Sequence, residues 1–262
     1  MKRGFIFLGI IGLVVASCST TKTAVVDVIE SPTVNGKAVK YLYSADKKDS
    51  SICTINYRYF EPVDQPYKDT VNKKIIEFTS LLTQFERTKL NGMKPSSDFF
   101  TAQLDSFVAI YLVEDYDENR MRWEMEGTIE IDDTREEIVQ LQTSGWAYTG
   151  GAHGNGAANT YIFDKKKGKE LQLVDFFSNT TEITAIAETY FRKLYELAPE
   201  ADLNEAGFWF ENGIFYLNNN FSIVGENIVF LYNSYEIAPY AGGQTILEIP
   251  IEEIKHLIKV KL

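Results

Sequence analysis

The sequence predicts an α+β protein in which antiparallel sheets pack against a few helices and two subdomains follow one another. Three observations lead to this fold class. Short segments alternate apolar and polar residues, which is typical of antiparallel strands with one face in water. Other segments repeat apolar residues every three or four positions, which is the spacing of helices. Strands and helices come in grouped runs rather than in strict alternation, which favours α+β over a parallel sheet.

Residues 1–18 have the composition of a targeting segment rather than of a folded element. Lys2 and Arg3 precede an apolar run, residues 4–15, that is shorter than an ordinary membrane span of about 20 residues. Small residues stand directly before Cys18, and this pattern resembles the lipobox of bacterial lipoproteins. We therefore expect a lipoprotein signal peptide, lipidation at Cys18 and attachment to a membrane through the N-terminal lipid. Ordinary secretory cleavage is the alternative.

Residues 19–36 are rich in Ser, Thr and Val without an amphipathic period, which predicts a flexible tether. The residues directly after Cys18 include no acidic one, which favours a periplasm-facing position in the bacterial envelope. Cys53 would then be the single free thiol, and its β-rich surroundings predict a buried structural residue. Without Lys2 and Arg3 the chain carries 24 basic against 37 acidic side chains, which argues against nucleic-acid binding.

Residues 37–130 are predicted to form the first subdomain. Residues 39–43 and 52–60 alternate like strands. A helix is expected from Pro66 to about Leu90, and a second one begins after a cap at Ser96 or Ser97. Their core stripes are Val71, Ile75, Phe78, Leu82 and Phe85 in the first helix, and Phe100, Leu104, Phe107 and Tyr111 in the second.

Residues 131–262 are predicted to form the second subdomain. A hairpin joins residues 120–131 to 137–148 across an acidic turn, which lacks the ligand spacing and glycine of a calcium loop. The further strands expected are 159–163, 169–173, 214–217, 221–224, 227–232 and 245–249. Asn179 and Glu182 form a capping-box pattern. The helix after it is expected to bury Ile183, Ile186, Tyr190, Leu194 and Leu197, and residues 251–258 form a last short helix.

A glycine-rich stretch, residues 148–156, is the most unusual part of the chain. It holds four glycines, among them Gly150 and Gly151, together with His153 and Asn155. Such glycine density predicts a tightly shaped loop between strands. His153 is the candidate catalytic imidazole, and the alternative is a structural residue hydrogen-bonded to neighbouring backbone. The second histidine, His256, is expected at the surface or at a helix end.

A second candidate segment, residues 235–243, carries Tyr235, Pro239 and Tyr240 beside two glycines. Tyrosine offers a rigid contact area with one polar group, so this loop suits a sugar or a protein surface. The alternative is a turn packed on its own core. Since connections of an antiparallel sheet gather at two ends, we expect this loop beside the glycine loop. The predicted binding residues are Gly150, Gly151, His153, Asn155, Tyr235, Pro239 and Tyr240.

Three stretches, residues 148–155, 159–171 and 235–243, together resemble the RsiV-like C-terminal envelope domain (DUF3298), a domain of unknown function. Residues 40–125 resemble the domain that often precedes it, shared with a peptidoglycan deacetylase (DUF4163, PdaC-like). The resemblance implies an extracytoplasmic, membrane-anchored protein. The best understood relative is an anti-sigma factor whose outer domain binds lysozyme, but this chain lacks its transmembrane and sigma-binding segments.

The expected function is therefore a non-catalytic envelope module that binds a protein or glycan, with a lysozyme-like protein as one candidate ligand. The alternative is an enzyme acting on cell-wall polysaccharide or peptidoglycan, with His153 as acid or base. The sequence contains no nucleophile elbow, no His-Glu-x-x-His and no phosphate-binding loop. Two histidines and one free thiol give no basis for a zinc site, so neither metal nor cofactor is expected.

Overall fold

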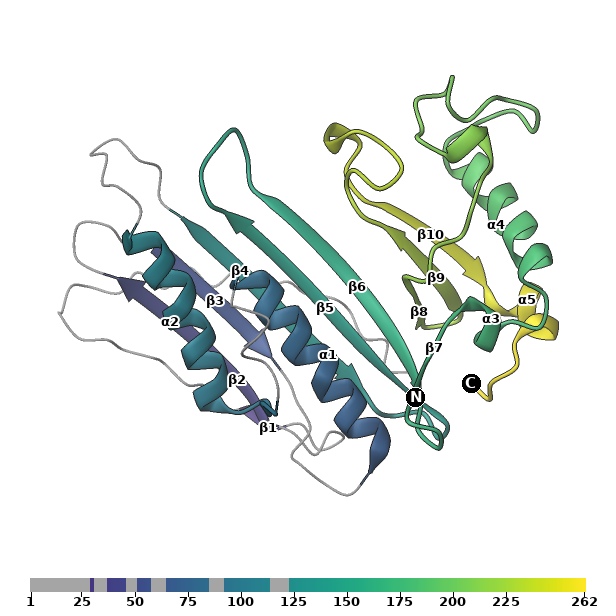
Figure 1. Ribbon diagram of the computed structural model, residues 1–262. Coiled ribbons are helices and arrows are strands. Elements are labelled where there is room, and N and C mark those ends of the chain that lie inside the picture. The colour runs from purple at the N-terminus through teal and green to yellow at the C-terminus, as the bar shows by residue number, and fades with distance from the viewer. Residues whose placement is uncertain (1–28, 31–36, 46–50, 58–64, 85–91, 114–122) are drawn as a thin grey trace.

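The computed structural model describes residues 29–30, 37–45, 51–57, 65–84, 92–113 and 123–262 (Figure 1). Residues 1–18, including Cys18, lie outside this set, as does most of the expected tether. Within that tether, Ile29–Glu30 forms a short strand, β1, instead of flexible chain. It pairs with Lys37 and Ala38, because the edge of the next strand offers free backbone groups.

The large sheet has seven strands that follow one another in chain order. After β1 come β2 (Lys37–Ala45), β3 (Ser51–Tyr57), β4 (Glu124–Asp132), β5 (Ile138–Tyr148), β6 (Asn155–Asp164) and β7 (Lys169–Leu171). Every neighbouring pair is antiparallel except β3 and β4, which are parallel. Two helices separate β3 from β4, and such a crossover returns the chain in the same direction. The predicted α+β class is confirmed, with this one parallel pair as an exception to its antiparallel sheets.

Helices α1 (Pro66–Leu82) and α2 (Ser97–Val113) cover one face of the large sheet (Figure 1). The Ser96 hydroxyl accepts a hydrogen bond from the Phe99 backbone, as the predicted cap requires. Phe100 and Phe107 are buried as expected, whereas Phe78 is only half-buried. The predicted Phe85 and the side chain of Tyr111 lie outside the described residues.

Helix α1 ends at Leu82, eight residues before the predicted end. Gln84 has a φ of 57°, which a right-handed helix cannot accommodate. Near this end the helix approaches β5 at Gly145, where an added Cβ would lie 2.8 Å from a Leu82 methyl carbon. Gly145 therefore permits the close contact between helix and sheet.

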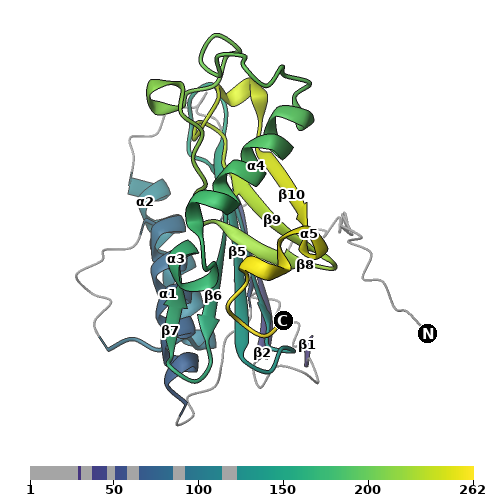
Figure 2. The ribbon, with the colours of Figure 1, turned by 90° about the vertical axis from the view of Figure 1, so that its right-hand side faces the viewer.

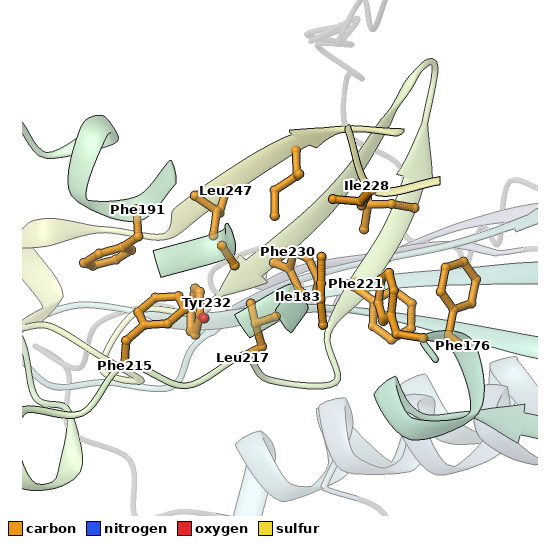
Figure 3. Packing of buried hydrophobic residues seen from close by; sticks show 14 of the residues in the cluster. Phe176, Ile183, Phe191, Phe215, Leu217, Phe221, Ile228, Phe230, Tyr232 and Leu247 are labelled. Atoms are coloured by element: carbon orange, nitrogen blue, oxygen red, sulfur yellow. The ribbon is translucent and has the colours of Figure 1, made fainter. Parts of the chain in front are cut away.

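The second sheet has three antiparallel strands in the order β10-β9-β8: β8 (Phe221–Val224), β9 (Asn227–Tyr232) and β10 (Thr245–Pro250). Its buried face joins α3 (Leu173–Phe176), α4 (Thr180–Leu194) and α5 (Ile251–Ile254) in an aromatic-rich core (Figure 3). The backbone N–H of Glu182 donates to Asn179, so the predicted cap is present. The predicted strand 214–217 is wrong, because these residues pair with no strand among the described ones.

Two sequence expectations about the C-terminal helices are corrected by this packing. Helix α4 buries Ile183, Ala187 and Phe191, a strict four-residue repeat, while Leu194 is 50% exposed. The predicted Ile186, Tyr190 and Leu197 pack against this core partly buried. Phe191, which was not predicted, lies within it, with its ring 4.8–5.5 Å from three other phenylalanines. The final segment is α5 followed by the 3₁₀ turn Lys255–Leu257 rather than one continuous helix.

The two cores lie on opposite faces of the same strands (Figure 2). In β5, Val139 and Leu141 face α1 and α2, whereas Ile138 faces the small sheet. This alternation follows from the two-residue period of a strand. The predicted division near residue 130 falls inside β4, and the large sheet continues across it through the β4–β5 pair.

Side-chain amides join the two sheets. Gln140 on β5 accepts from the Ile223 backbone N–H at 2.7 Å and donates to its carbonyl oxygen at 3.2 Å. The edge of β6 is bonded by Asn220, which accepts from Thr160, and by Asn233, which accepts from Ala158. These amides take the place of a neighbouring strand, so the small sheet is fixed against one end of β5 and β6.

None of the helices formed by the described residues combines the length and apolar character that crossing a bilayer requires.

Candidate functional site

The loop between β5 and β6 is shaped by its glycines. Gly150 and Gly151 have φ angles of 100° and 92°, which other residues rarely adopt. The Tyr148 hydroxyl donates to the Gly151 carbonyl oxygen at 2.9 Å and closes the turn. Nothing lies within 4 Å of a Cβ placed on either glycine, so these two candidates shape the loop rather than contact the rest of the molecule.

His153 stands at the end of this loop with its ring nitrogens engaged. Its Nδ1 lies 2.8 Å from the Gly154 carbonyl oxygen, and its Nε2 lies 3.4 Å from the Tyr235 hydroxyl. Because a carbonyl oxygen only accepts, Nδ1 carries a proton in its contact with Gly154, and Nε2 lies within hydrogen-bond distance of the Tyr235 hydroxyl. The contacts found for the imidazole are thus to backbone and to tyrosines rather than to an orienting carboxylate.

The loop between β9 and β10 brings the other aromatic residues. Tyr235 has a φ of 69°, and Glu236 holds this part of the loop by accepting from the Asn233 backbone and the Asn218 side chain. Pro239 directly precedes the 3₁₀ turn Tyr240–Gly242, which fixes the position of Tyr240. Tyr235 and Tyr240 remain 48% and 36% exposed.

The two loops lie side by side, as the sequence predicted, at the same end of the molecule (Figures 1 and 2). The rings of His153 and Tyr240 stack with centroids 4.1 Å apart and planes 16° apart. The Tyr240 hydroxyl donates to the Gly154 carbonyl oxygen at 3.2 Å, and the Tyr235 ring lies 5.4 Å from the Tyr240 ring. We call His153, Tyr235 and Tyr240 the aromatic junction.

The remaining candidates stand apart from these contacts. Asn155 is the first residue of β6, and its side-chain oxygen accepts a hydrogen bond from the Gly156 N–H. Its side chain therefore binds the backbone of its own strand. Pro239 is exposed beside Tyr240. His256 lies in the terminal 3₁₀ turn, where its Nε2 is 3.1 Å from a Glu182 carboxylate oxygen.

Sequence reasoning missed Trp146, which supports the junction from β5. A Cβ placed on Gly154 would lie 2.3 Å from the Trp146 ring, so the indole packs directly on that glycine. Only glycine fits there, which explains one of the four glycines of the loop. The alternation of β5 was readable, but the contact between Trp146 and Gly154 depends on the hairpin register.

An open groove of about 380 Å³ runs beside the aromatic junction over the outer face of β4, β5 and β6. Its floor includes two cross-strand rows, Glu126–Trp146–Gly156 and Thr128–Ser144–Ala158. Tyr240 and Gln244 line it from the β9–β10 loop. The residues described contain no group of three or more His, Cys, Asp or Glu side chains suited to a metal ion. The arrangement offers aromatic surfaces, hydroxyl groups and one carboxylate in a shallow recess.

Comparison with known proteins finds similarity to one family. Residues 174–252 match the family model "Protein of unknown function (DUF3298)". No curated protein matches the sequence. A DUF3298 family structure from Bacteroides fragilis NCTC 9343 aligns with a TM-score of 0.66 at 19% identity, covering 92% of this chain and 96% of that one.

A second DUF3298 family structure, from Pseudomonas aeruginosa PAO1, aligns with a TM-score of 0.55 at 17% identity, covering 90% of this chain and 95% of that one. At identities of 19% and 17%, the similarity shows a shared fold and nothing more specific. The alignments extend well beyond the matched residues, so the similarity of fold includes the large sheet as well as the small one. Residues 174–252 match the DUF3298 family model, and the chain shares its fold with structures of that family.

Proposed function

We propose that this protein is a lipid-anchored module of the bacterial envelope that binds a protein or glycan ligand without catalysis. The observation that carries the proposal is the aromatic junction. Three rings from two loops more than eighty residues apart are held together by stacking and hydrogen bonds, yet all three residues stay exposed. Exposed, rigid aromatic groups are favourable binding elements because they lose little conformational entropy on contact.

The surroundings of His153 support binding over the alternative of cell-wall hydrolysis. A general acid or base needs a free nitrogen and, in most hydrolases, an orienting carboxylate. Here one ring nitrogen bonds to the Gly154 carbonyl and the other faces Tyr235, while the ring itself stacks on Tyr240. The adjoining groove is open rather than deep, which also suits a binding surface.

The proposed location rests on the N-terminal sequence, with Cys18 as the lipidated residue and the domain facing the periplasm. The finer resemblance to RsiV-like proteins, with a PdaC-like first subdomain, belongs to the same proposal and makes a lysozyme-like protein one candidate ligand. The net charge of −11 suits encounter with a basic protein of that kind.

Binding is tested with the whole chain, immobilised and exposed in turn to a purified lysozyme and to soluble peptidoglycan fragments. We expect saturable binding of at least one probe, weakened about tenfold or more in His153→Ala and Tyr240→Ala proteins, because each substitution removes one stacked ring. His256→Ala is the matched control, since it removes the other histidine far from the junction. Binding of neither probe, or unchanged affinity in both junction variants, would contradict the proposal.

The lipid anchor has a separate test. A Cys18→Ser chain expressed in a bacterium should leave the membrane fraction or remain unprocessed, because the acyl chains that hold the protein need the thiol. Fractionation and mass measurement of the mature N-terminus would detect either result. A variant that matures and partitions like the wild type would refute lipidation at this residue.

A further inference from the structure

We propose that the groove over β4, β5 and β6 binds a short, neutral oligosaccharide, with Glu126 and Ser144 as polar contacts and Trp146 and Tyr240 as aromatic platforms. This inference deepens the proposed function and rests on it, since Tyr240 belongs to both the aromatic junction and the groove. It names the class of ligand and the residues of the sheet that hold it.

The groove exists because the small sheet covers only part of the outer face. Asn220 and Asn233 bond to β6 at Thr160 and Ala158, and beyond Ala158 the face is open up to the glycine loop. Gly156 and Ala158 present almost no side chain there, so the floor remains recessed between Trp146 on β5 and the β9–β10 loop. The hollow is therefore built from backbone register and small residues.

The polar groups of the recess match hydroxyl groups. Glu126 and Ser144 are exposed, and Thr128 is half-buried, so their oxygen atoms are accessible from the groove. Of the described residues that line the groove, Glu126 alone carries a charge. A carboxylate accepts hydrogen bonds, and hydroxyl and amide groups both accept and donate, which is the inventory that a polyol requires. The negative charge of Glu126 disfavours an anionic ligand.

The aromatic groups supply the second half of sugar recognition. Trp146 is half-buried and packs on Gly154, and Tyr240 is held by its stack on His153 and its hydroxyl bond to Gly154. Both rings are fixed before a ligand arrives, so binding costs little further ordering. The C–H faces of a pyranose ring are apolar and flat, and they pack on such rings while the hydroxyl groups remain at the edge.

Other occupants fit this groove less well. An added peptide strand needs a row of free backbone groups, but Ala158 already bonds to Asn233 and Asn220. An amphipathic helix needs a broad apolar channel, whereas this floor carries Glu126, Thr128 and Ser144. A recess with mixed polar and aromatic lining favours a small hydroxyl-rich ligand.

Two neutral probes, cellotetraose and tetra-N-acetylchitotetraose, are titrated calorimetrically into the whole chain. We expect saturable binding of at least one, with its Kd raised about tenfold in Glu126→Gln, because a charge-assisted hydrogen bond is lost. Ser144→Leu should abolish binding by filling the groove from its floor. Glu124→Gln is the matched control: Glu124 is exposed on the same face of β4 but pairs with Tyr148 outside the groove.

A thermal melt of each variant confirms that the fold is intact. Absence of saturable binding of both tetrasaccharides up to millimolar concentration overturns the inference, and so does wild-type affinity in either groove variant. If lysozyme or peptidoglycan binding depends on His153 and Tyr240 while neither tetrasaccharide binds, the binding function stands and this inference alone fails. If the His153 and Tyr240 variants bind lysozyme and peptidoglycan as the wild type does, and neither tetrasaccharide binds, both proposals fail.

Discussion

The outer face of β4, β5 and β6 is covered by the small sheet at one end and open at the other. At one end Gln140 is 2% exposed and Ile162 is 1% exposed beneath the small sheet. At the other end, four residues further along β5 and on the same face, Ser144 is exposed beside Trp146 and Glu126. A strand period therefore assigns residues to a face, but the covering element decides which of them become core and which become surface.

The two ends also differ in the partners of their polar side chains. At the covered end the Gln140 amide bonds to both backbone groups of Ile223, so its burial costs little. At the open end the polar groups of Glu126 and Ser144 face the groove. The same kind of side chain thus joins two sheets at one end and offers contacts to a ligand at the other.

The largest expected effect is at the covered end, in the aromatic core. Phe230 is fully buried, with its ring 5.7 Å from Phe221 and 6.4 Å from Phe177. We expect Phe230→Ala to lower the free energy of unfolding by about 3–5 kcal/mol, because it removes apolar burial and leaves a cavity. Chemical denaturation measures this value. Phe107→Ala on the opposite face should cost a similar amount, and a loss below about 1 kcal/mol in either variant would contradict the described packing.

The next effect tests the amide bridge between the sheets. Gln140→Ala leaves the Ile223 N–H and carbonyl without their partner in a buried setting, so the free energy of unfolding should fall by about 1–3 kcal/mol. Gln142→Ala is the control on the same face, since Gln142 is half-buried two residues away. Equal stability of the two variants would show that the bridge does not hold the sheets together.

A smaller effect depends on pH. Burial alone would raise the pKa of Asp132, but hydrogen bonds from Thr134 and Gln140 and the charge of Arg135 lower it overall. A depressed folded-state pKa contributes stability above the unfolded value of about 3.9, and this contribution is lost as pH falls below that value and through the lower folded-state pKa. The Asp132→Asn protein should therefore lose less unfolding free energy than the wild type when the pH is lowered from 7 to 3. Denaturation at pH 7 and pH 3 compares the two proteins, and an identical acid loss would contradict the prediction.

The smallest stability effect is expected at the open end. Ser144→Ala should change the free energy of unfolding by no more than about 0.5 kcal/mol, because Ser144 is exposed and lies outside both cores. The same denaturation assay measures it beside Gln140→Ala. A cost above about 1 kcal/mol would mean that the open face contributes to folding as the covered one does.

Most of the local structure was predictable. The cap at Ser96, the cap at Asn179 and the strands on both sides of the acidic turn follow from short-range patterns, and all are present. The predicted strand at residues 214–217 failed for a tertiary reason. Phe215 and Leu217 are buried and Ile214 is exposed, as in a strand, but no strand within the described part of the chain pairs with them. An alternation of apolar and polar residues indicates that one side of a segment is buried, whereas a strand also needs a second strand to pair with.

The candidate site was predictable in part. The glycine density of the β5–β6 loop and the tyrosines of the β9–β10 loop identified the two segments, and their meeting followed from the ends of an antiparallel sheet. Glu126 and Trp146 were not found, because a shared row depends on the register between β4 and β5. A shift of this register by one residue would have placed the two side chains on opposite faces of the sheet.

By itself the sequence determined most of the helices and strands and the tight glycine loop, because each depends on residues close together in the chain. The tertiary structure alone decided that His153 stacks on Tyr240, that Gln140 becomes core and that Ser144 becomes surface. The physical reason is the same in all three cases. Periodicity fixes the direction of a side chain, but what covers it comes from segments dozens of residues away, brought there by the packing of the small sheet on the large one.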